Sequence, residues 1–266
     1  MARLSIPYFV VNAFAEKPFA GNPAGICVLD RWLPAAAMQA IAAENGLPVT
    51  AFLVGVGGFY AMRWFTPVVE EEMCGHATLG AGWVVLNRLV PGLERVVFAT
   101  TAGALEVTRS SNIYTLDLPA QPPTVCTAPD MLVAALGAPP REVLRAAYYI
   151  AVFDNAGEIA ALQPDFAAIS ALDTPGLIAT APGVDIGCDI ATRYFAPAKG
   201  IPEDAATGSA HAQIVPYWSR RLGRTVLEAR QLSPRGGRMR CEDRGATIRL
   251  SAPAVLYLSG RIEYDA

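Results

Sequence analysis

The stretch RYFAPAKGIPEDAATGSAHA, residues 193–212, decides the fold because an earlier part of the chain echoes it. RWFTP at 63–67 matches RYFAP at 193–197, an offset of 130 positions (193 minus 63). The same offset relates GLPVTA at 46–51 to GLIATA at 176–181. We interpret this echo as an internal duplication, which predicts a chain of two similar halves.

Each copy then runs through a polar loop into a turn of small residues that is typical of a helix start. The turns are CGHAT at 74–78 and TGSAH at 207–211. Backbone N–H groups at a helix start, together with the helix dipole, attract carboxylates. The two turns therefore predict a binding site for a small carboxylate in a cleft between the halves. The alternative is that Gly and Ser are ordinary helix-start residues.

The rest of the chain predicts an α+β fold with mixed or antiparallel sheets, because hairpin-like spacings outnumber alternating strands and helices. Four helices are expected, at 34–45, 75–89, 164–172 and 208–222, and Pro216 should bend or split the last of them. We expect an N-terminal half at 1–120, a proline-rich linker at 121–128, and a C-terminal half at 129–266 whose last strands could return to the first half.

Composition excludes several classes of function. The chain has 266 residues, of which 53% are hydrophobic and 17% charged, enough for packed cores. A net charge of −3 argues against a nucleic-acid partner, and no apolar run is long enough to cross a membrane. Five cysteines, an odd number without regular spacing, predict a reducing compartment with no disulfide framework. We expect a cytoplasmic protein.

Glu44 is the carboxylate that the pattern singles out. It lies beside Asn45 at the end of an alanine-rich helix that Gly46 stops, where its charge opposes the C-terminal end of the helix dipole. That position tends to raise a carboxyl pKa, which suits a general acid or base. At the offset of 130 its counterpart is Thr174, so only one half offers such a group. The alternative is a solvated glutamate.

Both histidines of the chain lie within the two turns. His76 is a candidate site residue, whereas His211 lies further into its helix and is expected to be structural. Asp204 precedes the second turn by three residues (207 minus 204) and aligns with Cys74 at the offset of 130. It is a candidate proton carrier or a charge that stabilises the helix start.

Cys74 could act as a thiolate, since a helix start lowers the pKa of a thiol. A two-thiol racemase needs a second cysteine in the matching turn, which instead offers Thr207 or Asp204. No Cys or His pair has the spacing of zinc ligands, and there is no Walker loop and no GxGxxG after a strand. We therefore expect neither a metal nor a nucleotide cofactor.

A set of short motifs together resembles the PhzF-like family of phenazine biosynthesis, nearly end to end. They are FAGNPA at 19–24, AAEN at 42–45, RWFTP at 63–67, CGHAT at 74–78, RYFAP at 193–197, Glu203-Asp204 with TGSAH at 207–211, and QLSPRGG at 231–237. The resemblance implies a diaminopimelate epimerase-like fold. In that fold each of two pseudo-symmetric halves is a mixed or antiparallel sheet, or a barrel, around a central helix. It also implies a homodimer.

The resemblance implies a cofactor-independent isomerase that acts on a small carboxylate-bearing substrate. Glu44 would move the proton, and His76 and Asp204 would line the site. The substrate carboxylate would be bound by the residues of the two turns, which are Cys74, Gly75, Thr207, Gly208 and Ser209. Two alternatives stay open: an epimerase or racemase that depends on Cys74, and a protein that binds small acids without turnover.

The loop after Glu44 departs from the family. Where relatives commonly read ENNLSETAF, this chain reads ENGLPVTAF at 44–52 and lacks both the Ser and the second Glu. The resemblance therefore implies no particular substrate or pathway.

Overall fold

The computed structural model describes residues 3–265, which form two compact units. Unit 1 comprises the residues up to Asp117 and those from Ser251 onward, and unit 2 comprises Leu118–Leu250. Both units combine strands and helices, so the chain is α+β as the pattern predicts. The expected linker, 121–128, lies in unit 2 and contains a short strand, β9 (Thr124–Val125).

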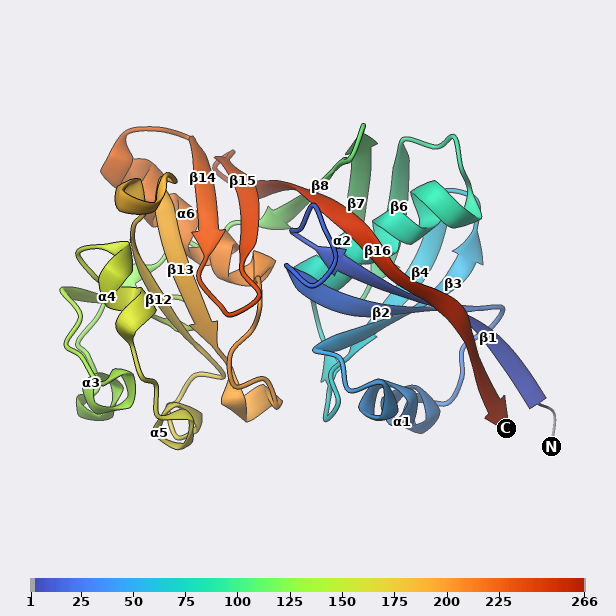
Figure 1. The fold of residues 1–266 in the computed structure, drawn as a ribbon, viewed down its shortest axis with the longest axis horizontal. Helices are drawn as coiled ribbons and strands as arrows, with labels where there is room; N and C mark the ends of the chain where they lie inside the picture. The colour runs from blue at the N-terminus through green and yellow to red at the C-terminus, as the bar shows by residue number, and fades with distance from the viewer. Residues whose placement is uncertain (1–2, 266) are drawn as a thin grey trace. The chain divides into compact units, whose positions relative to one another are not determined.

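Unit 1 is a mixed sheet that closes on itself (Figure 1). Its strands are β1 (Arg3–Ala13), β2 (Asn22–Leu29), β3 (Val49–Val56), β4 (Phe59–Phe65), β5 (Glu70–Glu71), β6 (Arg95–Thr100), β7 (Gly103–Ser110), β8 (Ile113–Pro119) and the second part of β16 (Thr247–Asp265). The β2–β3 and β4–β6 pairs are parallel, whereas β1–β2, β3–β4, β6–β7 and β7–β8 are antiparallel. Strand β16 pairs with both β1 and β8, which closes the sheet.

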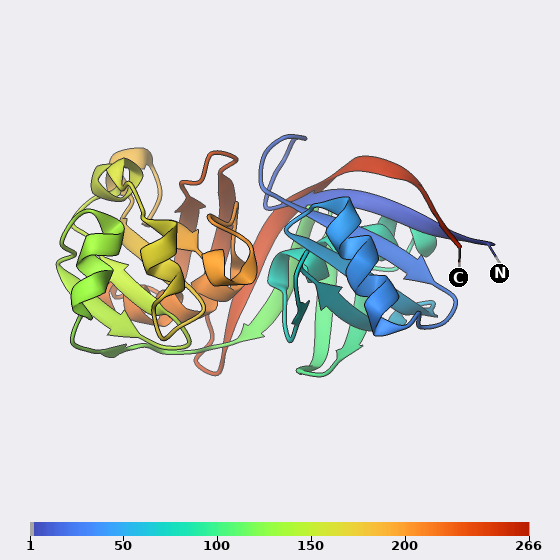
Figure 2. The ribbon, with the colours of Figure 1, turned by 90° about the horizontal axis from the view of Figure 1, so that it is seen from below.

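Two helices cover the two faces of this sheet. Helix α2 (Gly75–Val84) is buried inside it against β1, β2 and β3, and continues as a π-helical turn, Val85–Leu89. Helix α1 (Ala35–Asn45) lies on the outer face (Figure 2). Met38 and Ala42 of α1 are fully buried in one cluster with Phe52 and Phe65 of the sheet. The sheet thus holds the start of α2 inside unit 1 and the end of α1 on the surface of this unit.

Unit 2 repeats this plan with more helices. Its strands are β9, β10 (Glu142–Arg145), β11 (Tyr149–Val152), β12 (Leu177–Pro182), β13 (Ile190–Phe195), β14 (Val226–Gln231), β15 (Gly237–Asp243) and the first part of β16. Helix α6 (Gly208–Leu222) is buried along most of its length. Three short helices, α3 (Asp130–Leu136), α4 (Ala156–Ala161) and α5 (Phe166–Ser170), pack on β11, β12 and β13 through one hydrophobic cluster.

The strand register corrects part of the predicted duplication. Strands β3 and β4 correspond to β12 and β13, and both pairs are antiparallel. Phe65 lies opposite Thr50, but Phe195 lies opposite Leu177. The offset of 130 that relates the two phenylalanines therefore does not relate Thr50 to Thr180. The match between GLPVTA and GLIATA is wrong in register, whereas RWFTP and RYFAP occupy equivalent strands.

Pro216 does not split α6, which runs as one helix from Gly208 to Leu222. Proline lacks an N–H, so the carbonyl of Ala212, four residues earlier, loses its helical donor. The backbone N–H of Gln121 donates to that carbonyl instead, at 3.0 Å. A partner from outside the helix thus satisfies the group that proline leaves open.

Gly82→Ala is expected to destabilise the protein by about 1–3 kcal/mol because α2 packs tightly on β7. A Cβ at position 82 would lie 2.5 Å from Cγ1 of Val107, a stiff β-branched side chain. Gly80→Ala is the matched control: its Cβ would meet Val11 at an ordinary 3.5 Å, and alanine favours the helix by up to about 1 kcal/mol. Urea unfolding of both variants checks the prediction, which is wrong if the two shifts have the same sign.

Among residues 3–265, none of the helices combines the length and the apolar character that a membrane crossing requires.

Candidate functional site

The start of α2 lies in a buried turn. Cys74 is the N-cap residue, in an extended conformation (φ −140°, ψ 108°), and its side chain makes no capping hydrogen bond. The hydroxyl of Thr78 donates to the Cys74 carbonyl at 2.6 Å. The positive end of the helix dipole lies at this turn, where the sequence predicts an anion-binding site.

A thiol and an imidazole lie side by side in this turn. The Sγ of Cys74 is 3.3 Å from Nδ1 of His76, and both residues are buried. A thiol within hydrogen-bond reach of an imidazole can transfer its proton to that ring. The structure thus brings together Cys74, Gly75 and His76, the site residues that the sequence places in the first turn.

The start of α6 is built in the same way. Thr207 is its N-cap residue, in an extended conformation (φ −122°, ψ 102°), and its side chain does not cap the helix. Nδ1 of His211 lies 2.8 Å from the Thr207 carbonyl, the place that Thr78 takes in α2. The counterpart of Cys74 is therefore Thr207 and not Asp204. The loop from the end of β13 at 195 to Thr207 is three residues longer than the loop from the end of β4 at 65 to Cys74 (207 minus 195 against 74 minus 65).

His211 has a structural role at this helix start. Its ring is fully buried, and burial lowers its pKa from an ordinary value of 6.5 to about 4. The ring is neutral at physiological pH, and Nδ1 donates to the Thr207 carbonyl. This agrees with the structural role that its position in the sequence predicts.

The depressed pKa of His211 predicts that stability falls with acid. Between pH 6.5 and about 4 the unfolded chain binds a proton at His211 that the folded chain does not, so unfolding becomes easier as the pH falls through this window. The expected loss is up to about 3 kcal/mol. Urea unfolding at several pH values should show a flatter profile for His211→Gln than for the parent. Equal slopes would contradict the prediction.

Asp204 lies in a buried network just before α6. Its Oδ2 accepts the Thr207 hydroxyl at 2.5 Å, and its Oδ1 accepts the N–H of Ala205 at 3.1 Å. The side chain of Gln231, at the end of β14, fixes this turn. Its Oε1 accepts the Thr207 N–H at 2.8 Å, and its Nε2 donates to the Asp204 carbonyl at 2.7 Å and to the Thr207 hydroxyl at 3.1 Å.

The direction of these bonds orders the Thr207 hydroxyl. Because Gln231 donates to its oxygen, the hydroxyl proton points to Asp204. Gln231 has no role in the sequence prediction, although it begins the QLSPRGG motif. The structure thus brings together Asp204, Thr207, Gly208 and Ser209 in unit 2, with Gln231 as their support.

Glu44 is exposed in the last turn of α1. The helix ends as predicted, with Gly46 in the left-handed conformation (φ 61°). Asn45 donates from Nδ2 to the Thr50 hydroxyl at 3.2 Å and so ties the helix end to β3. Glu44 therefore stands on an anchored helix end in unit 1, and its catalytic role stays a prediction.

Each unit also holds an arginine–glutamate pair near its helix start. Arg63 binds Glu70 through two hydrogen bonds, of 2.6 and 2.7 Å, on the surface. Arg193 binds Glu203 through two bonds, of 2.8 and 3.0 Å, and both side chains are largely buried. The Arg63 guanidinium holds the pKa of Glu70 below its ordinary value. These pairs hold the loops that lead into α2 and α6.

Within residues 3–265, no group of three or more His, Cys, Asp or Glu side chains is placed to hold a metal ion. All five cysteines are free thiols.

Comparison with known proteins places these features in a family. Residues 11–260 match the PhzC-PhzF family, described as phenazine biosynthesis-like protein. An uncharacterized isomerase of Pseudomonas aeruginosa is 45% identical over 259 residues, which cover 97% of this chain and 99% of that protein. A PhzF family protein of Enterococcus faecalis superimposes with a TM-score of 0.92 at 42% identity, covering 97% of this chain and 99% of its own.

A more distant structure bears on the fold alone. A hydroxyproline epimerase from Agrobacterium vitis superimposes with a TM-score of 0.63 at 9% identity, covering 98% of this chain and 93% of its own. The expected diaminopimelate epimerase-like fold is confirmed, with two similar α+β halves that each enclose a helix.

Proposed function

Because the chain belongs to the phenazine biosynthesis-like protein (PhzC-PhzF) family, we propose that this isomerase moves a proton between two carbon atoms of a small carboxylic acid, without a cofactor. Glu44 is the general acid and base, His76 and Asp204 line the site, and the starts of α2 and α6 bind the substrate carboxylate.

One observation carries the proposal: the two helix starts share a design that presents the positive end of a buried helix at a turn of small residues. Both have an extended N-cap residue whose side chain does not cap the helix. In both, a side chain four residues later holds the N-cap carbonyl. Backbone N–H groups and the dipole at the positive end of a helix stabilise an anion such as a carboxylate.

The proposed reaction conserves atoms and electrons. The carboxylate of Glu44 takes a proton from one carbon, and the electron pair of that C–H bond moves into the adjacent π system. The protonated Glu44 then returns the proton to a second carbon, so that a double bond has shifted and Glu44 is again ionised. An exposed carboxylate on an anchored helix end can reach a substrate and return to its starting state.

A specific contact favours a second candidate function. The 3.3 Å approach of Cys74 Sγ to His76 Nδ1 suits a thiol that abstracts a proton, as in a Cys74-dependent epimerase. The unit 2 turn offers Thr207 and Asp204 in place of a second thiol, which makes the Glu44 reaction the preferred reading.

The test is deuterium uptake from D₂O. A panel of small unsaturated, hydroxy and cyclic acids is incubated with the protein, and mass spectrometry and NMR follow incorporation at carbon. The proposal expects enzyme-dependent incorporation into one acid class. Loss of incorporation in Cys74→Ala but not in Glu44→Gln would favour the epimerase, and tight binding without incorporation would favour a binding protein.

We further propose that the enzyme acts in the cytoplasm as a homodimer. Free thiols suit a reducing compartment. Light scattering should give twice the 28.2 kDa of one chain, and a mass of one chain would contradict the dimer.

A further inference from the structure

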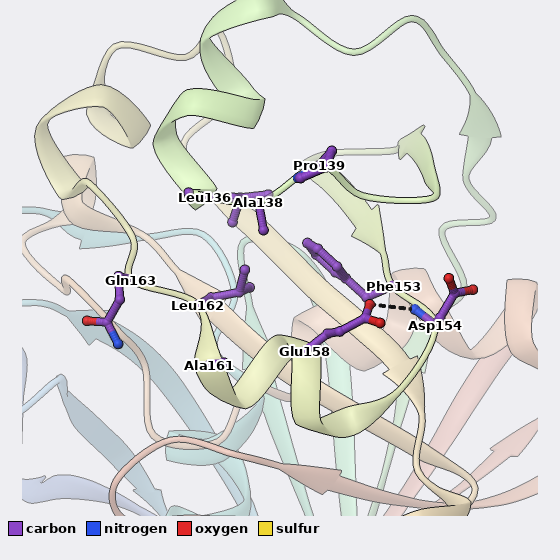
Figure 3. Close-up of a pocket in the computed structure, with 10 residues that line it drawn as sticks. Leu136, Ala138, Pro139, Phe153, Asp154, Glu158, Ala161, Leu162 and Gln163 are labelled. Atoms are coloured by element: carbon purple, nitrogen blue, oxygen red, sulfur yellow. Dashed lines mark hydrogen bonds between the residues drawn. The ribbon is translucent and has the colours of Figure 1, made fainter.

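A cavity of about 450 Å³ opens in unit 2, between the ends of α3 and α4 (Figure 3). Its apolar walls are formed by Leu136, Phe153 and Leu162, which also belong to the hydrophobic core of this unit. A volume in this range suits a small organic molecule, and such walls favour a hydrocarbon group. None of the residues assigned to the proposed reaction lines the cavity.

The charged residues of the cavity are both acidic. Asp154 and Glu158 line it, and Asp154 is paired with Arg141 at 2.7 Å. Glu158 accepts from the Asp154 N–H at 3.1 Å and from the Asn155 side chain at 2.8 Å. Both of these donors are neutral, and within residues 3–265 Glu158 forms no ion pair, so the Glu158 charge is not neutralised by a bonded cation. The cavity therefore favours a cationic ligand over an anion.

The end of α3 acts in the same direction. Its C-cap residue, Gly137, lines the cavity, whereas the carbonyl of Leu162 at the end of α4 already binds the Arg193 guanidinium. Carbonyl groups at the C-terminal end of a helix carry partial negative charge. This polarity is opposite to that of the starts of α2 and α6, so the end of α3 disfavours a carboxylate in the cavity.

One arginine links the cavity wall to the Asp204 turn. Nη1 of Arg193 donates to the carbonyls of Ile159 and Leu162, each at 3.0 Å, at the end of α4. The same guanidinium binds Glu203 through Nε and Nη2, and Glu203 directly precedes Asp204. A ligand that shifts or stiffens the end of α4 therefore acts on Arg193, and through Arg193 on Glu203.

We propose that this cavity binds a small organic cation with a hydrophobic group, and that Arg193 transmits its occupancy to the turn at 204–207. Binding does not depend on the proposed reaction. Only an effect of the bound cation on the isomerase reaction rests on the role that the proposed function assigns to Asp204.

Three probes of similar shape separate the contribution of charge to affinity from that of apolar contact. They are benzylammonium, benzyl alcohol and benzoate, and each is titrated into the full chain by calorimetry or NMR. We expect benzylammonium to bind at least about threefold more tightly than the alcohol, the scale of one exposed ion pair. Benzoate should bind most weakly. Equal affinities of the ammonium and the alcohol, or the tightest binding by benzoate, would overturn the proposal.

Two variants and a control locate the site. Glu158→Gln keeps the cap of α4, since Gln serves as well as Glu at this helix position, and should remove the preference for the ammonium. Ala161→Leu fills the cavity and should abolish binding of all three probes. Glu228→Gln, at an exposed position of β14 outside the cavity, should change nothing. Binding that survives Ala161→Leu would place the ligand elsewhere and overturn the proposal.

Amide hydrogen exchange tests whether occupancy of the cavity is transmitted to the turn at 204–207. With saturating benzylammonium, exchange of the N–H groups of Asp204 and Thr207 should slow at least about threefold, while that of β1 in unit 1 should not change. Unchanged exchange at 204–207 in the bound protein would overturn the link. This readout needs no turnover, so its failure is distinct from failure of the proposed isomerase reaction.

Discussion

Glu44→Gln is expected to reduce deuterium incorporation into the substrate by about 10²–10⁴-fold, the contribution of a general acid or base. The glutamine keeps the size of the side chain but cannot carry the proton. Since Glu44 is exposed, the fold should survive, and removal of a negative charge from the end of α1 costs no helix stability.

The measurement is incorporation at carbon from D₂O under single-turnover conditions, with thermal unfolding of the same samples. Glu106→Gln is the control, because Glu106 is also an exposed glutamate of unit 1 and pairs with Arg95 on the surface. If Glu44→Gln turns over like the control, Glu44 is not the acid and base. Incorporation at parent rates with an altered affinity would instead make Glu44 a binding residue.

Arg193→Met should destabilise the protein by about 3–5 kcal/mol, because it leaves Glu203 as a largely buried charge without its partner. The carbonyls of Ile159 and Leu162 lose their donor in the same step. Methionine keeps most of the hydrophobic length of the side chain, so lost packing is a small part of the effect.

The duplication supplies the control for this prediction. Arg63→Met removes the equivalent arginine of unit 1, whose pair with Glu70 is much more exposed, and should cost no more than about 1 kcal/mol. Urea unfolding of both variants gives the comparison. Equal losses would show that burial does not set the strength of these pairs, and failure of Arg63→Met to fold would contradict its surface role.

The sequence predicts the features that depend on local pattern. Small residues after a polar loop locate both helix starts, and Gly46 ends α1 as expected. A local signal for α4 was present but not used in the prediction: Asn155 caps the helix and Glu158 follows three residues later, which is the capping-box pattern. The existence of two similar halves also follows from a repeat that is legible in the chain.

Features that depend on distant partners could not be predicted. Pro216 keeps its helix whole because Gln121 lies against it, and no local pattern reports that contact. By sequence, Thr50 of β3 matches Thr180 of β12, but by strand pairing it corresponds to Leu177. The matching letters hide this shift of three residues (180 minus 177). Gln231 supports Asp204 only because β14 ends beside the turn. Such long-range pairings come from tertiary packing.

Strand β16 has a consequence for the order in which the molecule is completed during translation. Unit 2 is one uninterrupted segment, Leu118–Leu250, whereas the closed sheet of unit 1 needs residues from Ser251 onward. Since the ribosome delivers the chain from its N-terminus, the whole of unit 2 is available to fold before unit 1 receives its last strand. Until then β1 presents an unpaired edge to the cell, and the half that is synthesised first is finished last.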